Sequence, residues 1–340
     1  MYKRLLTLAT HKIHNLPIIV LMPHSRCNCR CVMCDIWKAN NNKKEISVEE
    51  LSKHVSTFRS LGLREIVLSG GEALMHSNLW MLCDLLKREG IKVTLLSTGL
   101  LLEKHAEAIT EYIDNAIISI DGSQAVHDRI RNIPGGYEKI KSGIQALKKI
   151  KPGFKITARC VLQRFNFHDF IDIVRSAQDL RFGQISFLAA DVSTMAFNHV
   201  FTLANERISE IALSQSETLR FDKIVHQSFI ELKEAYRSKF IAERPKKMLQ
   251  IVQYYKGLNG MADYPRTKCN APWVSAVIES NGDVMPCFFH QPYGNIYKDS
   301  FSAIVNSKEA ISFRKNLDIT RNAICNKCVC SLKLGVTQMN

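Results

Sequence analysis

Short apolar runs alternate with amphipathic segments along the first 190 residues of the chain. Helical spacing of apolar side chains, as at Leu51, Val55 and Phe58, fills the stretches between these runs. Six runs rich in β-branched and aliphatic residues predict strands at Ile18–Met22, Glu65–Ser69, Ile91–Ser97, Ala116–Asp121, Phe154–Leu162 and Gln184–Leu188. Repeated alternation of strand and helix predicts a parallel sheet.

Several of the predicted helices have recognisable ends. Ser47 and Glu50 form the pattern of a capping box, and Gly62 is suited to end the helix that follows. Gly90 ends the next periodic segment in the same way. Further helices are expected over 103–114, 137–150 and 168–181.

The number of strand–helix units limits the choice of fold. Six units are fewer than the eight of a closed barrel, so an α/β partial barrel or a doubly wound sheet is expected. In both, ligands bind at the carboxyl ends of the strands. We assign residues 1–190 to this unit, 191–265 to a mainly helical connecting region, and 266–340 to a small α+β region. Helices are expected in the connecting region at Glu217–Phe240 and Lys246–Gly257, with a break at Pro245.

Composition and charge exclude several classes of protein. No run approaches the roughly 18 apolar residues that a membrane span needs. The segment 1–17 is a poor signal peptide, because polar and charged residues interrupt its apolar part, so a cytoplasmic protein is expected. The net charge of +14 indicates a solvated basic surface or attraction to an anionic partner. Nucleic acid is not expected, because no basic stripe is interleaved with aromatic residues.

Three closely spaced cysteines follow the first predicted strand. Cys27, Cys31 and Cys34 form a Cys-x3-Cys-x2-Cys run where a parallel barrel has its active site. A structural zinc site uses four protein ligands, and iron–sulfur clusters are usually held by four cysteines. A [4Fe–4S] cluster with three cysteines leaves one iron open to a group that is not protein. The run therefore indicates a reactive cofactor.

This cysteine run resembles the signature of the radical S-adenosylmethionine (SAM) superfamily. The resemblance implies a partial (β/α)6 barrel, a [4Fe–4S] cluster on Cys27, Cys31 and Cys34, and SAM bound to the open iron. In that family an electron from the cluster cleaves SAM to methionine and a 5′-deoxyadenosyl radical, which takes a hydrogen atom from the substrate. The resemblance also implies an external electron donor such as flavodoxin or ferredoxin.

Two further elements strengthen the resemblance. Gly70, Gly71 and Glu72 follow the second predicted strand and look like the family's GGE element, which binds the amino group of the SAM methionine. Ser119 and Asp121 begin a stretch that resembles the IDG…HDxIR motif of the subgroup with SPASM or twitch domains. At the carboxyl end of their strand, both are expected to bind ribose hydroxyls of SAM.

Other residues near these motifs have less specific patterns. Ser97 is expected in the SAM pocket, although relatives often have Thr-Asn-Gly after this strand. Met33 stands where many members have an aromatic side chain against adenine, and its sulfur can make that contact. Cys29 is interpreted as a spare thiol, and Cys83 and Cys160 as core residues.

Candidates for substrate contacts and for a catalytic base remain open. Arg159 and Asn166 are expected at the mouth of the barrel, where they contact substrate or SAM or form surface ion pairs. Asp191, His199 and His290 are candidates for a base or a substrate contact, and a structural or solvent-exposed role is the alternative for each.

A second set of cysteines lies in the last region: Cys269, Cys287, Cys325, Cys328 and Cys330. A predicted hairpin with its turn at Asn281-Gly282 places the first two near its ends. Four thiolates hold either zinc or an iron–sulfur cluster, and spacing alone does not decide. The set resembles the twitch domain, the shortened SPASM domain, which implies one auxiliary [4Fe–4S] cluster on Cys269, Cys287, Cys325 and Cys328. Cys330 competes with Cys328 as the fourth ligand.

The function expected from these features is oxidation of a substrate by a radical SAM enzyme, with the auxiliary cluster accepting an electron. Only 26 residues precede Cys27, too few for a peptide-binding domain, so a small molecule or an unaided protein is the expected substrate. The first alternative is a peptide maturase that cross-links side chains of ribosomally made peptides. The second is a non-enzymatic, zinc-stabilised binding module.

Overall fold

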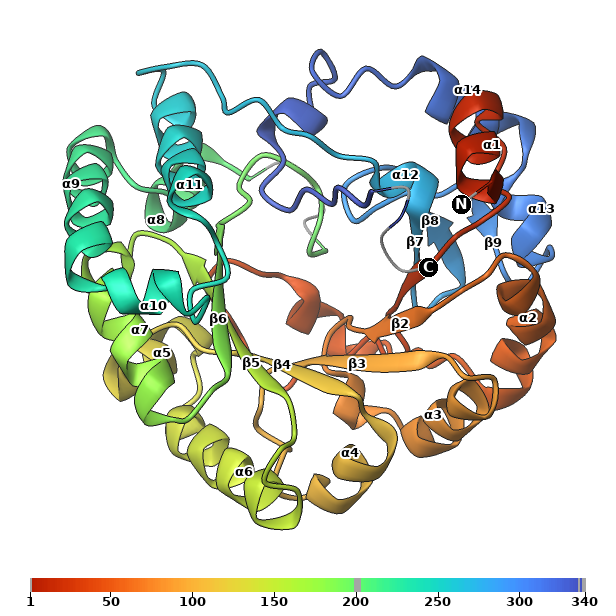
Figure 1. Ribbon diagram of the computed structural model, residues 1–340, viewed down its shortest axis with the longest axis horizontal. Coiled ribbons are helices and arrows are strands. Elements are labelled where there is room, and N and C mark those ends of the chain that lie inside the picture. The colour runs from red at the N-terminus through yellow and green to blue at the C-terminus, as the bar shows by residue number, and fades with distance from the viewer. Residues whose placement is uncertain (1, 199–202, 336, 338–340) are drawn as a thin grey trace.

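One curved, open sheet organises the computed structural model, which describes residues 2–198, 203–335 and 337 (Figure 1). Nine strands pair in the order β6-β5-β4-β3-β2-β1-β7-β8-β9. All neighbours from β6 to β7 are parallel, and the last two pairs are antiparallel. The expected partial barrel is therefore confirmed, and a doubly wound sheet is not formed.

The strands are β1 (Ile18–Leu21), β2 (Glu65–Leu68), β3 (Lys92–Ser97), β4 (Asn115–Ser119), β5 (Ile156–Leu162), β6 (Gln184–Ala189), β7 (Ser275–Ile278), β8 (Asp283–Met285) and β9 (Gly294–Asn295). The helices are α1 (Tyr2–Thr10), α2 (Val48–Ser60), α3 (Leu79–Arg88), α4 (Ala106–Tyr112), α5 (Gln124–Arg131), α6 (Gly136–Ile150), α7 (Phe170–Asp179), α8 (Asn205–Ile211), α9 (Gln215–Glu231), α10 (Lys233–Arg237), α11 (Pro245–Leu258), α12 (Ala271–Val274), α13 (Phe301–Val305) and α14 (Lys308–Asn316). Short 3-10 turns are η1 (Ile36–Asn41), η2 (Ala73–Met75), η3 (Phe167–Asp169) and η4 (Cys325–Lys327).

Helices α2, α3, α4, α6 and α7 cover the outer face of the sheet (Figure 1). Burial alternates along the strands, as in β2, where Ile66 and Leu68 are fully buried and Glu65 and Val67 are half-buried. Alternation arises because successive strand residues point to opposite faces. The inner face therefore keeps room for a ligand. Among the described residues, no helix is long and apolar enough to cross a bilayer.

The strands predicted from the sequence are confirmed, with ends shifted by at most two residues. The Ser47 hydroxyl accepts from the Glu50 amide as expected, but the Glu50 carboxylate binds Lys53 and His54 instead of closing a capping box. A complete capping box starts α9, at Ser214. The single helix expected over 217–240 is two helices, α9 and α10, separated at Leu232.

The C-terminal region continues the barrel sheet. β7 lies parallel to β1, and the Met22 amide donates to Ile278 O at 2.8 Å. The expected hairpin forms between β7 and β8, with Gly282 at φ +88° in its turn. The seventh parallel strand was not anticipated, because the hairpin sequence contains no information about a partner 250 residues away. The division into three domains stays a prediction.

Candidate functional site

The loop that carries the first cysteine run follows β1 and is held by backbone hydrogen bonds. The Asn40 side chain binds both backbone groups of Cys27, at 2.9 Å each. The Trp37 indole donates to Cys34 O at 2.9 Å. Two amides of the loop, those of Arg30 and Val32, donate to the end of α5 at 3.1 Å each. These contacts fix the positions of the cysteines before any cofactor is considered.

The Gly-Gly-Glu element packs directly against this loop. The Glu72 amide donates to Arg26 O at 2.8 Å. A Cβ atom on Gly71 would lie 2.1 Å from Arg26 O and 3.1 Å from Cys27 N, so no larger residue fits there. Gly70 has φ +108°, a conformation that L side chains rarely adopt. Both glycines are therefore required by the approach of β2 to the cysteine loop.

The Glu72 carboxylate is completely buried and organises the end of β3. It accepts from the Ser97 hydroxyl at 3.0 Å and from the Thr98 amide and hydroxyl at 2.7 Å each. The Leu74 amide donates to the same carboxylate at 3.1 Å. Burial raises the pKa of Glu72, and these hydrogen bonds oppose the rise. The structure thus brings the predicted residues Glu72 and Ser97 together, with Thr98 as a partner that the sequence analysis missed.

A buried ion pair connects α5 to the first cysteine run. Asp121 is fully buried and accepts from Arg131 Nε at 2.6 Å. Arg131 Nη1 lies 3.6 Å from Cys31 Sγ. Burial alone would lower the pKa of Arg131, but the charges of Asp121 and Cys31 raise it above its ordinary value. Arg131 is therefore a fixed positive charge beside Cys31.

The predicted ribose contact of Asp121 involves a side chain that already has other hydrogen-bond partners. The second oxygen of Asp121 accepts from the Val161 amide at 3.3 Å, and its own amide donates to His127 Nδ1 at 3.3 Å. Burial lowers the pKa of His127 to about 4, which keeps this nitrogen an acceptor. Ser119 is half-buried and lies in register with Arg159 of β5. Contact of Ser119 and Asp121 with ribose stays a prediction.

Burial dominates the acid–base chemistry of two of the first three thiols, those of Cys27 and Cys34. It raises the pKa of Cys27 and of Cys34 to about 12 each. A hydrogen bond from Cys29, helped by Arg131, lowers the pKa of Cys31 against the effect of burial. Cys29 is itself buried, so it supports Cys31 rather than facing solvent. Buried thiols of this kind ionise readily only beside a bound cation.

Unpaired polar atoms beside the thiols test whether an anionic or metal-bound group fits this loop. Arg26 Nε and Asn28 Nδ2 are buried and have no hydrogen-bond partner in the described part of the chain. Both are donors within the cysteine loop, and each is costly to leave unpaired. Three thiols on a loop that also carries two unsatisfied donors fit an iron–sulfur cluster with bound SAM.

The other predicted residues near this loop have mixed placements. Met33 Sδ lies 3.7 Å from Gln163 Nε2, at the end of β5. Asn166 is fully buried and donates to Asp121 O, and Arg159 donates to Ser186, so both have structural contacts. Cys83 and Cys160 are fully buried core residues, as expected.

The second set of cysteines surrounds the hairpin ends and η4. Cys287 is near Cys325 and Cys269, and burial raises its pKa to about 12. The His290 ring lies 3.3 Å from Cys325 Sγ. Burial raises the pKa of both Cys328 and Cys330, and Arg159 and Lys247 near Cys330 oppose the rise there. Among the residues that the structure describes, no three His, Cys, Asp or Glu side chains are arranged to hold one metal ion.

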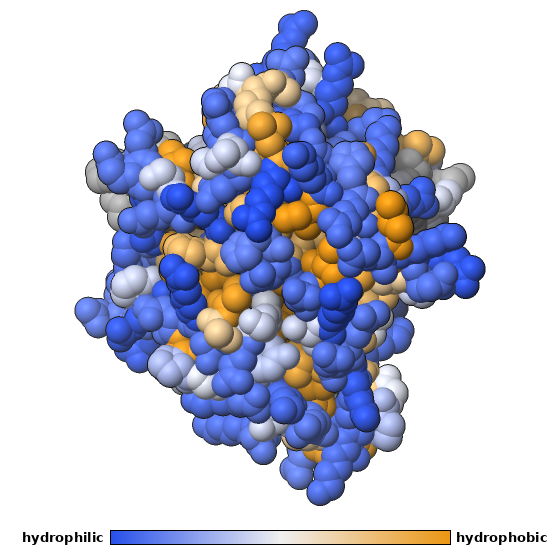
Figure 2. Space-filling view, turned by 90° about the vertical axis from the view of Figure 1, so that its left-hand side faces the viewer, coloured by the Kyte–Doolittle hydropathy of each residue, from blue (hydrophilic) through white to orange (hydrophobic). Residues whose placement is uncertain are grey.

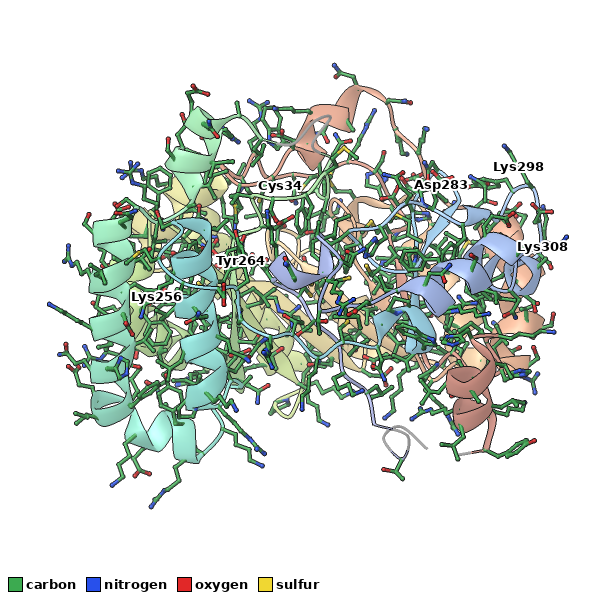
Figure 3. The ribbon with its side chains drawn as sticks, turned by 90° about the horizontal axis from the view of Figure 1, so that it is seen from above. Cys34, Lys256, Tyr264, Asp283, Lys298 and Lys308 are labelled. Atoms are coloured by element: carbon green, nitrogen blue, oxygen red, sulfur yellow. The ribbon has the colours of Figure 1, made fainter. Side chains whose placement is uncertain are left out.

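A cavity of about 640 Å³ lies between the two cysteine sets. One wall is formed by His24, Gly70 and Gly71, next to the first set. The opposite wall is formed by 288–292, directly after Cys287. Figure 3 shows Cys34 and Asp283, a residue of the hairpin wall, on the same side of the molecule.

The loop after β6 closes the third side of this cavity. Asp35, next to Cys34, donates its amide to Phe197 O and accepts from Asn198 Nδ2, both at 3.1 Å. The Phe197 ring lies 6.4 Å from the Phe289 ring. This loop therefore connects the first cysteine run to the wall beside Cys287.

The three base candidates have different environments. Asp191 accepts from Ser193 and Thr194 and so shapes the loop after β6. His290 lines the cavity. His199 lies outside the described residues.

Besides Thr98, two residues of the site were missed from the sequence, for different reasons. Arg131 is the last arginine of the HDxIR motif, and that motif was the signal for it. Asn40 stands in a run of three asparagines that reads only as a polar loop. The contact of the Asn40 side chain with the Cys27 backbone, 13 residues away, leaves no local pattern in the sequence.

Comparison with known proteins agrees with this site. The family model described as "Radical SAM superfamily" matches residues 21–177, and the SPASM model, described as "Iron-sulfur cluster-binding domain", matches residues 269–329. The AdoMet-dependent heme synthase of Methanosarcina barkeri is 25% identical over 308 residues, which cover 86% of this chain and 82% of that protein.

A second relative and a solved structure extend the comparison. The antilisterial bacteriocin subtilosin biosynthesis protein AlbA of Bacillus subtilis is 24% identical over 292 residues, 83% of this chain. The chain spans 58% of the length of AlbA. Streptococcus suis SuiB bound to precursor peptide SuiA has a TM-score of 0.67 at 16% identity, over 97% of this chain and 74% of that one, and so shares the fold.

The two family models match the two parts of the chain that hold the two cysteine sets. In this family SAM and a [4Fe–4S] cluster are the cofactors, and the SPASM domain adds auxiliary iron–sulfur binding. The chain belongs to the radical SAM superfamily and carries a C-terminal SPASM domain.

Proposed function

We propose that this chain is an oxidising radical SAM enzyme that acts on a peptide or protein side chain. The observation that carries the proposal is the cavity of about 640 Å³, which has residues adjoining both cysteine sets in its walls. A substrate in this cavity is within reach of both cofactors. The bound cluster and SAM supply a 5′-deoxyadenosyl radical that takes a hydrogen atom from the substrate.

The residues of the first site have distinct proposed roles. Cys27, Cys31 and Cys34 ligate the cluster. Glu72 fixes Ser97 and the end of β3 for SAM, and the Gly70-Gly71 backbone approaches the methionine end of SAM. Ser119 binds ribose, as the family resemblance implies. The observed contacts of Asp121 favour a different role from ribose binding, namely orienting Arg131 toward Cys31.

The second cysteine set is proposed to hold one auxiliary [4Fe–4S] cluster on Cys269, Cys287, Cys325 and Cys328. We favour Cys328 over Cys330 because the Cys328 amide donates to Cys325 O at 3.2 Å, so these two cysteines lie on one tight turn. A cluster held by these cysteines would accept one electron from the substrate after hydrogen-atom removal, and one proton would pass to solvent or a nearby base. The substrate would then be oxidised by two electrons in total.

Two features favour a peptide over a small molecule. AlbA is named for the biosynthesis of a bacteriocin, and it matches 83% of this chain. Met195 and Phe197 line the cavity and are 50% and 38% exposed, so an apolar rim is present for a peptide side chain. A small-molecule substrate is the second candidate, supported by the likeness to heme synthase along 82% of that protein.

The electron donor and the compartment belong to the same proposal. In the cell, a low-potential donor protein such as flavodoxin or ferredoxin reduces the first cluster. The chain has eleven cysteines, and none is paired in a disulfide. Unpaired thiols and reducible clusters suit a reducing compartment, so we propose the cytoplasm.

The first experiment is anaerobic reconstitution followed by iron analysis, EPR and detection of 5′-deoxyadenosine. Wild-type protein is expected to hold about eight irons, two [4Fe–4S] clusters, and to cleave SAM. The Cys27/Cys31/Cys34→Ala variant is expected to keep about four irons and lose SAM cleavage. Cys83→Ala, a buried cysteine outside both sets, is the control and keeps both clusters.

Substrate is tested with a synthetic copy of any short peptide encoded beside the gene, read out by mass spectrometry. A loss of two hydrogens that needs SAM supports the proposal. If the wild-type protein holds only about four irons, it has no auxiliary cluster to accept an electron, and the reaction would be redox-neutral. If the reconstituted protein holds no iron, the proposal that it is a radical SAM enzyme is refuted.

A further inference from the structure

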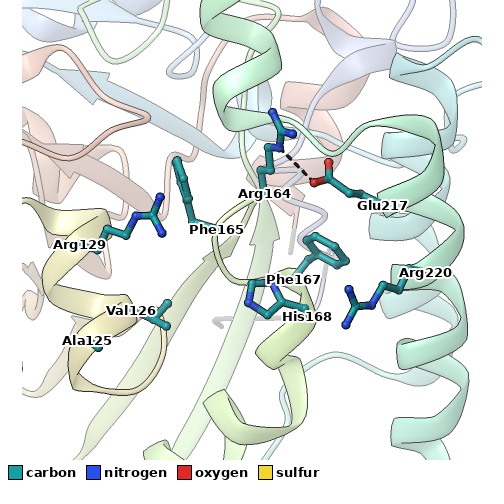
Figure 4. A pocket seen from close by; sticks show the side chains of 9 residues that line it. All are labelled: Ala125, Val126, Arg129, Arg164, Phe165, Phe167, His168, Glu217 and Arg220. Carbon is teal, nitrogen blue, oxygen red and sulfur yellow. Dashed lines mark hydrogen bonds and ion pairs between the residues drawn. The ribbon is translucent and has the colours of Figure 1, made fainter.

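A second concave surface lies outside the barrel, between α5, η3 and α9. It encloses about 440 Å³ and is lined by Ala125, Val126, Arg129, Arg164, Phe165, Phe167, His168, Glu217 and Arg220 (Figure 4). None of these residues lines the substrate cavity. We call this surface the arginine pocket.

Two arginines of the pocket carry uncompensated charge. The Arg129 guanidinium lies 4.5 Å from the centre of the Phe165 ring. In Figure 4 the Arg220 side chain points toward Phe167 and His168. Within the part of the chain that the structure describes, neither arginine has an acidic partner within 4 Å. Arg164 differs, because Glu217 accepts from it at 3.1 Å.

The arginine pocket is adjacent to the first cysteine run. Arg129 is exposed on the last turn of α5, two residues before the buried Arg131, which lies 3.6 Å from Cys31 Sγ. Backbone carbonyls in the last turn of the same helix accept hydrogen bonds from the Arg30 and Val32 amides of the cysteine loop. Two positions along α5 therefore separate an arginine of the pocket from the arginine beside Cys31, a proposed cluster ligand.

Contacts through α8 extend this surface along the cysteine loop. Arg207 of α8 donates to Val32 O, and Arg164 donates to Ser209 O at 2.7 Å. The face on the α9 side of the molecule is mainly hydrophilic, with apolar side chains exposed between the polar ones (Figure 2). Arg207 is also paired with Glu210 at 3.5 Å, and Arg164 with Glu217, so the uncompensated positive charge on this face lies at Arg129 and Arg220.

We propose that the arginine pocket is the docking surface for an acidic electron-donor protein, an inference that rests on the proposed function. Opposite charge steers such a partner, and the net charge of +14 adds to the attraction. A peptide substrate must enter the cavity between the cysteine sets, which shares no lining residue with this pocket. An electron donor needs only a surface near the first cysteine run, and α5 carries both Arg129 in the pocket and Arg131 beside Cys31.

The test compares two reductants in SAM cleavage without substrate. The Arg129→Gln/Arg220→Gln variant is expected to lose about tenfold in 5′-deoxyadenosine formation with reduced flavodoxin at low salt. Its rate with dithionite, a small reductant, is expected to match the wild type. Arg129→Lys/Arg220→Lys keeps the charge and is expected to keep most of the flavodoxin-driven rate. The control Arg59→Gln/Arg88→Gln removes the same charge from exposed positions on α2 and α3 and keeps both rates.

Three results would overturn the proposal. The first is an unchanged flavodoxin-driven rate in the Gln variant. This includes the outcome in which the variant loses peptide binding but keeps that rate. The second is an equal loss with dithionite, which would mean that the cluster site itself was altered. The third is an equal loss in the control. Wild-type protein inactive with both reductants would instead refute the proposed function, and this inference with it.

Discussion

At the scale of single residues, the site is set by close packing between backbones rather than by side-chain ligands alone. Gly71 is the clearest case, because its missing side chain lets β2 approach the cysteine loop. Glu72 then uses its amide on that loop and its carboxylate on the end of β3. Two adjacent residues thus join three of the segments that form the proposed SAM pocket.

Gly71→Ala tests this packing. The added Cβ would meet Arg26 O at 2.1 Å, so the loop bearing Cys27 must move by about an ångström. A displacement of that size at a reacting centre costs about 100-fold in rate. We expect this loss in dithionite-driven SAM cleavage, together with a lower iron content.

Gly153→Ala is the matched control, because no atom lies within 4 Å of a Cβ there. It is expected to behave as the wild type. Normal SAM cleavage by Gly71→Ala would contradict the packing argument.

At the scale of elements, α5 connects the cysteine loop, the buried ion pair and the arginine pocket. Its last turn accepts two amides of the cysteine loop and presents Arg131 to Cys31. The ion pair between Arg131 and Asp121 joins the helix to the end of β4. The position of this one helix therefore determines the charge beside the proposed cluster.

Asp121→Asn tests the buried ion pair. The variant leaves the Arg131 charge buried without its partner, and such a loss costs about 3–5 kcal/mol of folding free energy. The double variant Asp121→Asn/Arg131→Gln, with no buried charge, is expected to recover part of this. Urea unfolding under anaerobic conditions measures the free energy of unfolding of both variants.

The control Asp84→Asn breaks an exposed ion pair with Arg88 and is expected to cost under about 1 kcal/mol. Equal effects of the two Asp→Asn changes would contradict the argument.

The elements also show what a sequence can and cannot predict. The parallel strands were found because their apolar runs are periodic and bounded, and the cysteine runs because their spacing is short. Glu72 and Ser97 were each identified, but their contact was not, since it joins positions 25 residues apart. The arginine partner of Asp121 was not foreseen, because a strand-end acid has no local feature that reveals one. Folding brings such pairs together, and only the structure shows which groups are already paired.

At the scale of the whole molecule, one sheet and one core unite the regions that hold the two cysteine sets. β7 lies between β1 and β8, and Val277 and Ile278 are almost fully buried. Phe301 of α13 packs edge-to-face on Phe58 of α2, with ring centres 5.2 Å apart. The distance between the two proposed clusters is therefore fixed by strand pairing and not by a flexible linker.

Removing residues 266–340 is expected to unfold the barrel edge as well. The loss would expose the edge of β1. It would also remove the burial of Val277 and Ile278, and burying each side chain contributes about 1.5–3 kcal/mol. The total stability of a protein is about 5–15 kcal/mol, so this loss is large. An uncovered strand edge also favours aggregation. Hydrogen exchange of a peptide covering residues 18–22 measures the effect, since the Met22 amide bonds to Ile278 O. The full-length Cys325→Ser/Cys328→Ser variant separates the strand from the cluster, because it loses proposed ligands and keeps β7. We expect slow exchange in that variant and fast exchange in the truncated chain. A truncated chain that stayed monomeric, with slow exchange in β1, would show instead that the SPASM region is a separable domain.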